Sequence, residues 1–225
     1  MRHKSRLLAI CVAGASGLAA QSTSAPVISY DLTVDGGQLA RAVSIAGLGR
    51  HAFFGDGRLL LGYGVRASYY FGDGIKYRPA GARNVPAGVY DTLTIGTSRV
   101  IALNVSAHAA VRVAGPLELG MNIDIVGVGA GGSASGSYRT SGTASPVSVS
   151  ASPASFNLFQ YGSKDRGSLN SEFYAAWRAT PAWTVRGGLA HFLAEYQANR
   201  QLNSNTDRFR IYKNLGFLGL RWTPR

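Results

Sequence analysis

The stretch that decides the fold is residues 99–130, RVIALNVSAHAAVRVAGPLELGMNIDIVGVGA. Apolar side chains occupy every second position over residues 99–113 and most second positions over residues 117–130, and a period of two is that of a β-strand. The three residues 114–116 predict a tight turn between the two arms. In the resulting register Val113 lies opposite Leu117, Arg112 opposite Glu118, His108 opposite Asn122 and Ser106 opposite Asp124.

The length of this hairpin sets its possible surroundings. Each arm has about 14 residues, whereas a strand in a globular protein usually has roughly 5 or 6. A tilted strand crosses a lipid bilayer with about 9–11 residues. The hairpin is therefore long enough to span a membrane and protrude from it.

The N-terminus carries the features of a secretory signal peptide. Basic residues at positions 2, 4 and 6 precede an apolar stretch that ends at the small residues Ala19 and Ala20. We therefore predict a signal peptide over residues 1–20 and a single domain over residues 21–225. The chain contains one cysteine, Cys11, so the remaining domain has neither disulfides nor thiolate metal sites.

The charge of the domain does not indicate a nucleic-acid partner. Taking the three basic residues of the leader from 23 leaves 20 against 11 acidic residues, a net charge of +9. The arginines are spread along the chain without forming a basic cluster or a basic helix, which nucleic-acid binding would favour. We expect no nucleic-acid partner.

Further alternating segments repeat the hairpin pattern. Together with the two arms they give eight expected strands, at residues 28–35, 39–53, 58–71, 99–113, 117–130, 169–179, 183–197 and 209–222. The connections near residues 55, 115 and 181 are short, and those over residues 73–97, 131–167 and 198–207 are long. Residues 131–155 are almost all Gly, Ser, Ala and Thr, a composition that predicts a mobile loop.

This arrangement predicts an all-β fold. Short turns on one side, long loops on the other and both termini on the turn side require an even number of strands. Lipid offers no hydrogen-bond partners to an open sheet edge, so a spanning sheet must close on itself. We predict an eight-stranded antiparallel up-and-down transmembrane β-barrel with short periplasmic turns and long extracellular loops.

The faces of the strands predict a polar lumen and an apolar wall. The polar faces contain almost no Lys, which is unlike a solvated exterior. The expected lumen polar network is Arg58, Arg66, His108, Arg112, Glu118, Asn122, Asp124, Glu172, Arg178 and Arg186, with an Arg112 to Glu118 contact. The expected aromatic girdles are Trp177, Trp183 and Trp222 at the periplasmic ends and Tyr69, Phe71 and Phe209 at the outer ends.

On this pattern and on the terminal strand LGFLGLRW, residues 215–222, the chain resembles small bacterial outer-membrane β-barrel proteins of the OmpX, OmpW and OmpA-barrel kind. It looks closest to uncharacterised outer-membrane β-barrel families of Gram-negative genomes. The resemblance implies a place in the cell outer membrane, with outer-membrane lipid, lipopolysaccharide and the barrel-assembly machinery as partners. It departs from the pattern in that Thr223, Pro224 and Arg225 follow the last aromatic residue, Trp222.

Several functions are compatible with such a barrel. The leading prediction is a structural or surface-interaction role carried by the extracellular loops, with no enzymatic activity and no cofactor. One alternative is a narrow pore that favours anions, because arginines outnumber acids in the expected lumen. A second is a lipid A-modifying enzyme using His191 and Glu195, expected on the lipid-facing side. A third is a soluble lipocalin-like carrier, in which the apolar faces would point inward.

Overall fold

The computed structural model describes residues 25–54, 57–80, 91–141, 145–202 and 205–224. The expected signal peptide, residues 1–20, lies outside the described residues. Within the described part the chain forms eleven strands, and Gly162–Lys164 form a short 3-10 helix. No helix in this part is long and apolar enough to cross a membrane.

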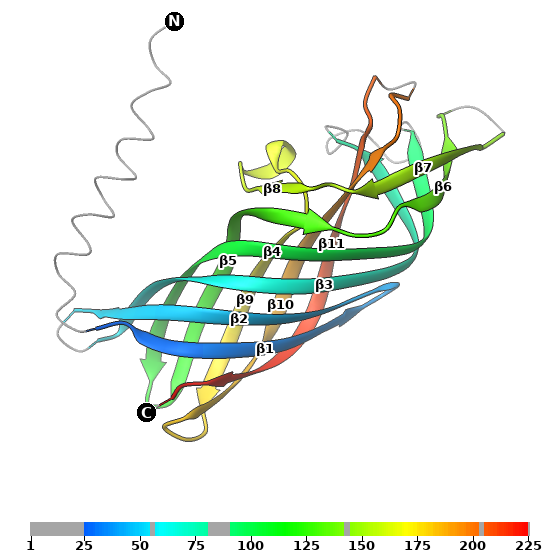
Figure 1. Ribbon diagram of the computed structural model, residues 1–225. Coiled ribbons are helices and arrows are strands. Elements are labelled where there is room, and N and C mark those ends of the chain that lie inside the picture. Colours follow the sequence, from blue (N-terminus) through cyan, green and yellow to red (C-terminus); the bar gives the residue numbers. More distant parts are fainter. Residues whose placement is uncertain (1–24, 55–56, 81–90, 142–144, 203–204, 225) are drawn as a thin grey trace, which may run out of the picture.

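Eight of the strands pair in a closed ring, whose course can be followed in Figure 1. They are β1 (Val27–Gly37), β2 (Ala40–Phe53), β3 (Leu59–Pro79), β4 (Thr92–Ala114), β5 (Leu117–Ala130), β9 (Leu169–Arg178), β10 (Trp183–Ala198) and β11 (Arg208–Trp222). Each pairs antiparallel with the next in this order, and β11 pairs with β1. The expected all-β, antiparallel, up-and-down arrangement of eight strands is therefore confirmed.

The two ends of the ring differ. The connections 54–58, 115–116 and 179–182 lie at one end, together with the start of β1 and the end of β11; we call this the turn end. The long connections after β3, β5 and β10 lie at the other, the loop end, where a tight hairpin also joins β1 to β2.

The two faces of the ring are apolar outside and polar inside. On β1, Tyr30, Leu32 and Val34 are exposed while Asp31, Thr33 and Asp35 are buried. On β4, Ile101, Leu103 and Val105 are exposed while Asn104, Ser106 and His108 are buried. This is the inverse of a water-soluble barrel, in which the apolar face forms the core.

At the loop end the eight-stranded ring continues into a second ring with fewer strands. The β1–β2 hairpin ends at Gly37 and Ala40, and beyond it β11 pairs directly with β3, with Phe209 opposite Pro79 and Arg210 opposite Arg78. On the other side β6 (Ala134–Arg139) and β7 (Val147–Pro153) replace β5 and β9, because β6 pairs with β4 and β7 with β10. The ring β3-β4-β6-β7-β10-β11 thus has six strands, and we call it the loop-end ring.

The interior of the loop-end ring and of the adjoining part of the barrel is an aromatic core. Its largest members pack in pairs: Tyr70 stacks on Phe192 with ring centroids 4.8 Å apart, and Tyr77 meets Tyr196 edge-on at 5.2 Å. Tyr138 and Phe209 meet edge-on at 5.9 Å. Further buried side chains of the core come from β2, β3, β4, β6, β7, β10 and β11. This aromatic core closes the lumen toward the loop end.

Two expectations about the loops were wrong. Residues 131–155 do not form one mobile loop, because β6 and β7 pair with each other and with β4 and β10; Tyr138 and Val149 anchor them in the aromatic core. Residues 73–97 are not a loop throughout either, since β3 continues to Pro79 and β4 begins at Thr92.

Candidate functional site

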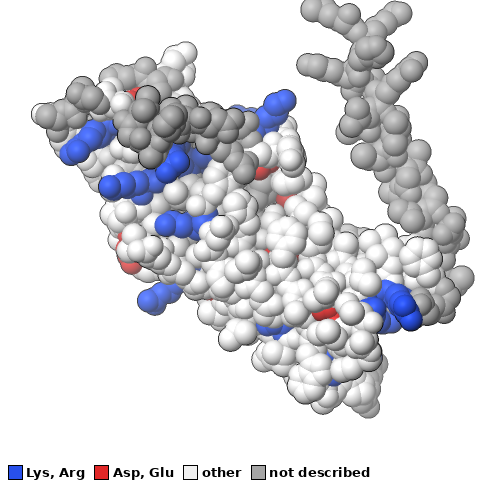
Figure 2. Space-filling view, turned by 180° about the vertical axis from the view of Figure 1, so that it is seen from behind, with Lys and Arg blue, Asp and Glu red and all other residues white. Residues whose placement is uncertain are grey.

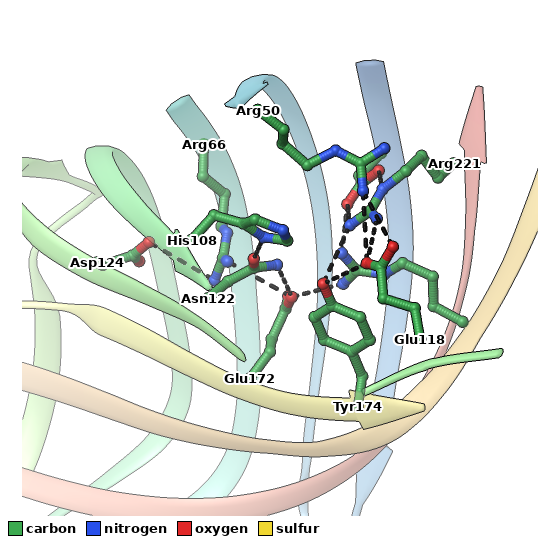
Figure 3. A network of polar contacts seen from close by, with 11 residues as sticks. Arg50, Arg66, His108, Glu118, Asn122, Asp124, Glu172, Tyr174 and Arg221 are labelled. Carbon is green, nitrogen blue, oxygen red and sulfur yellow. Dashed lines mark hydrogen bonds and ion pairs between the residues drawn. The ribbon is translucent and has the colours of Figure 1, made fainter. Parts of the chain in front are cut away.

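A network of charged side chains lies in the lumen, on the turn-end side of the aromatic core, and Figure 3 shows it from close by. It contains four arginines and four carboxylates: Arg50, Arg66, Arg186, Arg221, Asp31, Glu118, Asp124 and Glu172. We call these eight residues the lumen network. Strict alternation along the strands places their side chains on the inner face of the ring.

Asp31 and Glu172 form the centre of the lumen network. Arg221 binds Asp31 with two hydrogen bonds, Nε to Oδ1 at 2.7 Å and Nη2 to Oδ2 at 3.1 Å. Arg186 donates from Nη1 to Asp31 and from Nη2 to Glu172 Oε2, the latter at 2.6 Å. Because Arg186 and Arg221 are buried, Asp31 is the carboxylate that compensates both charges most directly.

Nearer the turn end, Glu118 accepts hydrogen bonds from three side chains. Arg221 Nη1 donates to its Oε1 at 3.0 Å, Arg50 Nη1 lies 3.4 Å from both oxygens, and the Tyr174 hydroxyl donates at 3.2 Å. The Tyr174 ring also lies under the Arg186 guanidinium, 4.5 Å from centroid to Cζ, a cation–π geometry. A Cβ at Gly120 would lie 2.5 Å from the Tyr174 hydroxyl oxygen, so glycine there leaves room for this tyrosine.

Asp124 and its amide neighbours complete the network on the side of β5. Arg66 Nη1 lies 3.5 Å from Asp124 Oδ1, and Asn104 Nδ2 donates to Asp124 Oδ2 at 2.8 Å. Nearby, Asn122 Nδ2 donates to Glu172 Oε2 at 2.7 Å, and its Oδ1 lies 2.5 Å from His108 Nδ1. His108 is therefore held as an interior polar residue.

Charge compensation and packing leave little space in this part of the lumen. The four arginines of the network face its four carboxylates. The Asp35 carboxylate is buried on the same inner face, and neither of its oxygens has a hydrogen-bond partner among the described residues. A cavity between Asp31, Arg66, Glu172 and Arg186 measures about 10 Å³, room for about one water molecule. Among the described residues no group of His, Cys, Asp and Glu is arranged to hold a metal ion.

The structure brings together seven of the ten residues expected in the lumen polar network. These are Arg66, His108, Glu118, Asn122, Asp124, Glu172 and Arg186. Arg58 and Arg178 are exposed instead, and Arg112 is only partly buried and donates to the Gly57 carbonyl at 3.1 Å. All three lie at or next to strand ends. An inward-facing side chain at the rim of the ring is not enclosed by the other strands.

The expected ion pair between the side chains of Arg112 and Glu118 was wrong. The two residues do face each other in the β4–β5 register, but the carboxylate of Glu118 is bound by Arg50 and Arg221. Neither of these arginines is among the residues expected in the lumen from the sequence. The position of Arg221 could have been predicted, because it lies between two apolar residues, Leu220 and Trp222, which face outward. Arg50 lies on the strand with the least regular pattern.

Five of the six expected girdle residues lie at the surface. Tyr69, Trp177, Trp183 and Trp222 are exposed and Phe71 is partly exposed. Tyr30 joins them at the turn end by stacking on Trp222 at 5.6 Å. Phe209 was wrongly placed, because it is buried in the aromatic core. On β11 it is Leu215 and Phe217 that point inward, with Leu218 and Leu220 outward.

His191 and Glu195, the residues considered for lipid chemistry, take part in separate contacts. His191 Nδ1 lies 2.7 Å from Asn214 Oδ1, and its ring stacks on Tyr212 at 5.4 Å. Glu195 is on the outer side of β10 but is not lipid-facing, since it is buried and bound by Arg208 through two hydrogen bonds of 2.7 and 2.8 Å. The β10–β11 register runs unbroken through both residues.

The sequence matches no known protein family and no curated protein. The fold is similar to several solved structures at low identity, of which three are described. Neisserial surface protein A is 10% identical over 88% of this chain and 96% of that chain, with a TM-score of 0.34. A major outer membrane protein from Thermus thermophilus is 11% identical over 87% and 98%, with a TM-score of 0.38. The toluene transporter TodX of Pseudomonas putida is 8% identical over 93% of both chains, with a TM-score of 0.25.

Proposed function

We propose that this chain is an integral outer-membrane β-barrel with a closed lumen, whose loop-end ring and loops carry a structural or surface-interaction role outside the cell. The observation that carries the proposal is the inversion of the two faces. Leu, Val, Ile, Tyr and Trp side chains cover the outer wall, while four arginines and the five carboxylates of Asp31, Asp35, Glu118, Asp124 and Glu172 are enclosed. An apolar wall of this extent in water would be an aggregation liability, whereas in lipid it is the favourable face.

The backbone supports the same environment. Each of the eight strands is paired on both sides, so the ring has no open sheet edge. A bilayer requires this closure. The shorter strands, β9 with 10 residues and β1 with 11, have the length that crosses a bilayer. Figure 2 shows a largely white wall, with Lys and Arg gathered toward the loop end and at the opposite rim.

We assign the turn end to the periplasm and the loop end to the cell exterior, since outer-membrane barrels have short periplasmic turns and longer external loops. At the outer limit of the apolar wall, Arg41 and Arg99 lie on either side of Phe71 in register and are exposed. We infer that these cations contact lipopolysaccharide phosphates. The face inversion argues against a lipocalin-like carrier, which needs an apolar interior.

An arginine placed on the wall tests the membrane assignment. Val65 is exposed midway along the stretch where β3 pairs with β2, so Val65→Arg is expected to cost about 2–4 kcal/mol of unfolding free energy in lipid vesicles. Val113 is equally exposed but lies next to the end of β4 at the turn end, and Val113→Arg is expected to cost about 1 kcal/mol or less.

Urea unfolding in vesicles gives these free energies, and the gel mobility of unheated against boiled membrane fractions shows whether each variant is a folded barrel. Equal and negligible costs at the two positions, with the protein in the soluble fraction, would refute the membrane assignment.

The closed lumen predicts electrical silence. The lumen network and the aromatic core block the barrel one after the other along its axis. The purified chain is therefore expected to give no steady conductance steps in planar bilayers. A porin added to the same bilayers serves as the positive control. Regular steps that increase in number with the amount of this protein would instead favour the narrow anion pore.

A further inference from the structure

A cavity of about 230 Å³ opens at the turn end of the barrel, next to the lumen network. Its walls come from the turn-end limits of β1, β2, β4, β5, β9 and β10, from the turns at residues 115–116 and 179–182, and from the segment that follows β11. It is smaller than the roughly 300–1,000 Å³ of sites for drug-sized ligands. A ligand of headgroup size fits it.

The charge of the cavity is strongly unbalanced. Three arginines line it, Arg50, Arg112 and Arg178, against one carboxylate, Glu118. That carboxylate is already bound by Arg50 and by Arg221 from the lumen network. Within the described part of the chain, neither Arg112 nor Arg178 has a carboxylate partner. The cavity therefore keeps an excess of positive charge.

The hydrogen-bonding groups are also incompletely used. The Arg50 Nε is buried and has no hydrogen-bond partner among the described residues. Arg112 is held in place by the Gly57 carbonyl at 3.1 Å through one Nη, which leaves its other donors available. Thr184 and Thr223 add two hydroxyl groups to the lining. Several donors and an excess of cations in one small cavity are the features of an anion site.

We propose that this cavity binds a phosphate group, with Arg112 and Arg178 as its principal ligands. Guanidinium groups match phosphate oxygens with paired hydrogen bonds, and several arginines favour a doubly charged anion over chloride. The phosphate has two possible sources, free phosphate and the headgroup of a membrane phospholipid. Phosphate binding follows from the chemistry of the cavity alone, and only the phospholipid source requires the membrane assignment.

Calorimetric titration of the full chain, folded in a maltoside detergent without phosphate, tests the site. Inorganic phosphate and glycerol 3-phosphate are the two probes, with sodium chloride at matched ionic strength as the blank. We expect saturable binding of at least one probe at one site per chain. In Arg112→Gln/Arg178→Gln the affinity is expected to fall about tenfold or more, and in the matched double variant Arg139→Gln/Arg200→Gln, which removes two exposed arginines far from the cavity, to stay unchanged.

The outcomes separate the sources and can refute the site. Tighter binding of inorganic phosphate indicates the free ion, and tighter binding of glycerol 3-phosphate indicates the lipid headgroup; both support the proposal. The absence of saturable binding, or binding that the cavity variant retains in full, overturns it. Gel mobility before and after boiling verifies that each variant is folded. Arg178→Gln alone, at an exposed guanidinium, provides a milder variant if the double change prevents folding.

Discussion

Asp31→Ala is expected to lower the free energy of unfolding by about 3–5 kcal/mol, the usual cost of removing one partner from a buried ion pair. Asp31 binds both Arg186 and Arg221, which are completely enclosed by the ring. Glu172 and Glu118 remain near them, but neither replaces the paired hydrogen bonds to Arg221. Urea unfolding followed by tryptophan fluorescence, in vesicles or in detergent, measures the loss.

Two controls show that the effect of Asp31→Ala comes from the buried charge. Asp73 is exposed and accepts one hydrogen bond, from Thr97 at 3.4 Å, so Asp73→Ala is expected to change stability by about 0.5 kcal/mol or less. The double variant Asp31→Ala/Arg221→Met is expected to be more stable than Asp31→Ala, because the uncompensated arginine is also removed. A stable Asp31→Ala protein would mean that solvent in the lumen compensates the arginines.

Phe209→Ala is expected to cost a similar amount, about 3–5 kcal/mol, for a different reason. The side chain is 0% exposed and packs edge-on against Tyr138 in the aromatic core. Its truncation leaves a cavity that rigid neighbouring strands cannot fill. The loss should fall on the loop-end ring, where Phe209 also forms the β11–β3 pair, so protease cleavage between β6 and β7 is expected to accelerate.

Phe54 supplies the matched control for Phe209, because it is 72% exposed in the turn between β2 and β3. Phe54→Ala is expected to alter the unfolding free energy by about 0.5 kcal/mol. Equal effects of the two phenylalanine variants would contradict the assignment of Phe209 to a packed core. Faster cleavage between β6 and β7 in Phe209→Ala, with an unchanged gel shift on heating, would locate the damage in the loop-end ring.

The hairpin over residues 99–130 shows how far alternation alone predicts structure. Three of its expected pairs are confirmed, Arg112 with Glu118, His108 with Asn122 and Ser106 with Asp124. The fourth was wrong, because a register shift after Arg112 places Ala114, not Val113, opposite Leu117. The prediction succeeds here because one face meets the polar lumen and the other is apolar, so the two faces differ at nearly every step.

The same reasoning failed where both faces are apolar. On β11, Leu215 and Phe217 point into the aromatic core while Leu218 and Leu220 point outward, so hydropathy does not distinguish inside from outside. On β6 and β7 the outward side chains are mostly serine, and the strands form because β4 and β10 extend far enough to pair with them. Such order depends on tertiary partners and not on local composition.

The direct β3–β11 pairing has a consequence for the order of folding. β11 closes the eight-stranded ring against β1 and the loop-end ring against β3, joining Trp222 to Tyr30 and Phe209 to Pro79. Both closures bring together residues far apart along the chain, which carries a large loop-closure entropy and slows folding. A chain that ends before β11 leaves β10 unpaired on that side in both rings. Neither ring can therefore close before β11 has paired with its neighbours.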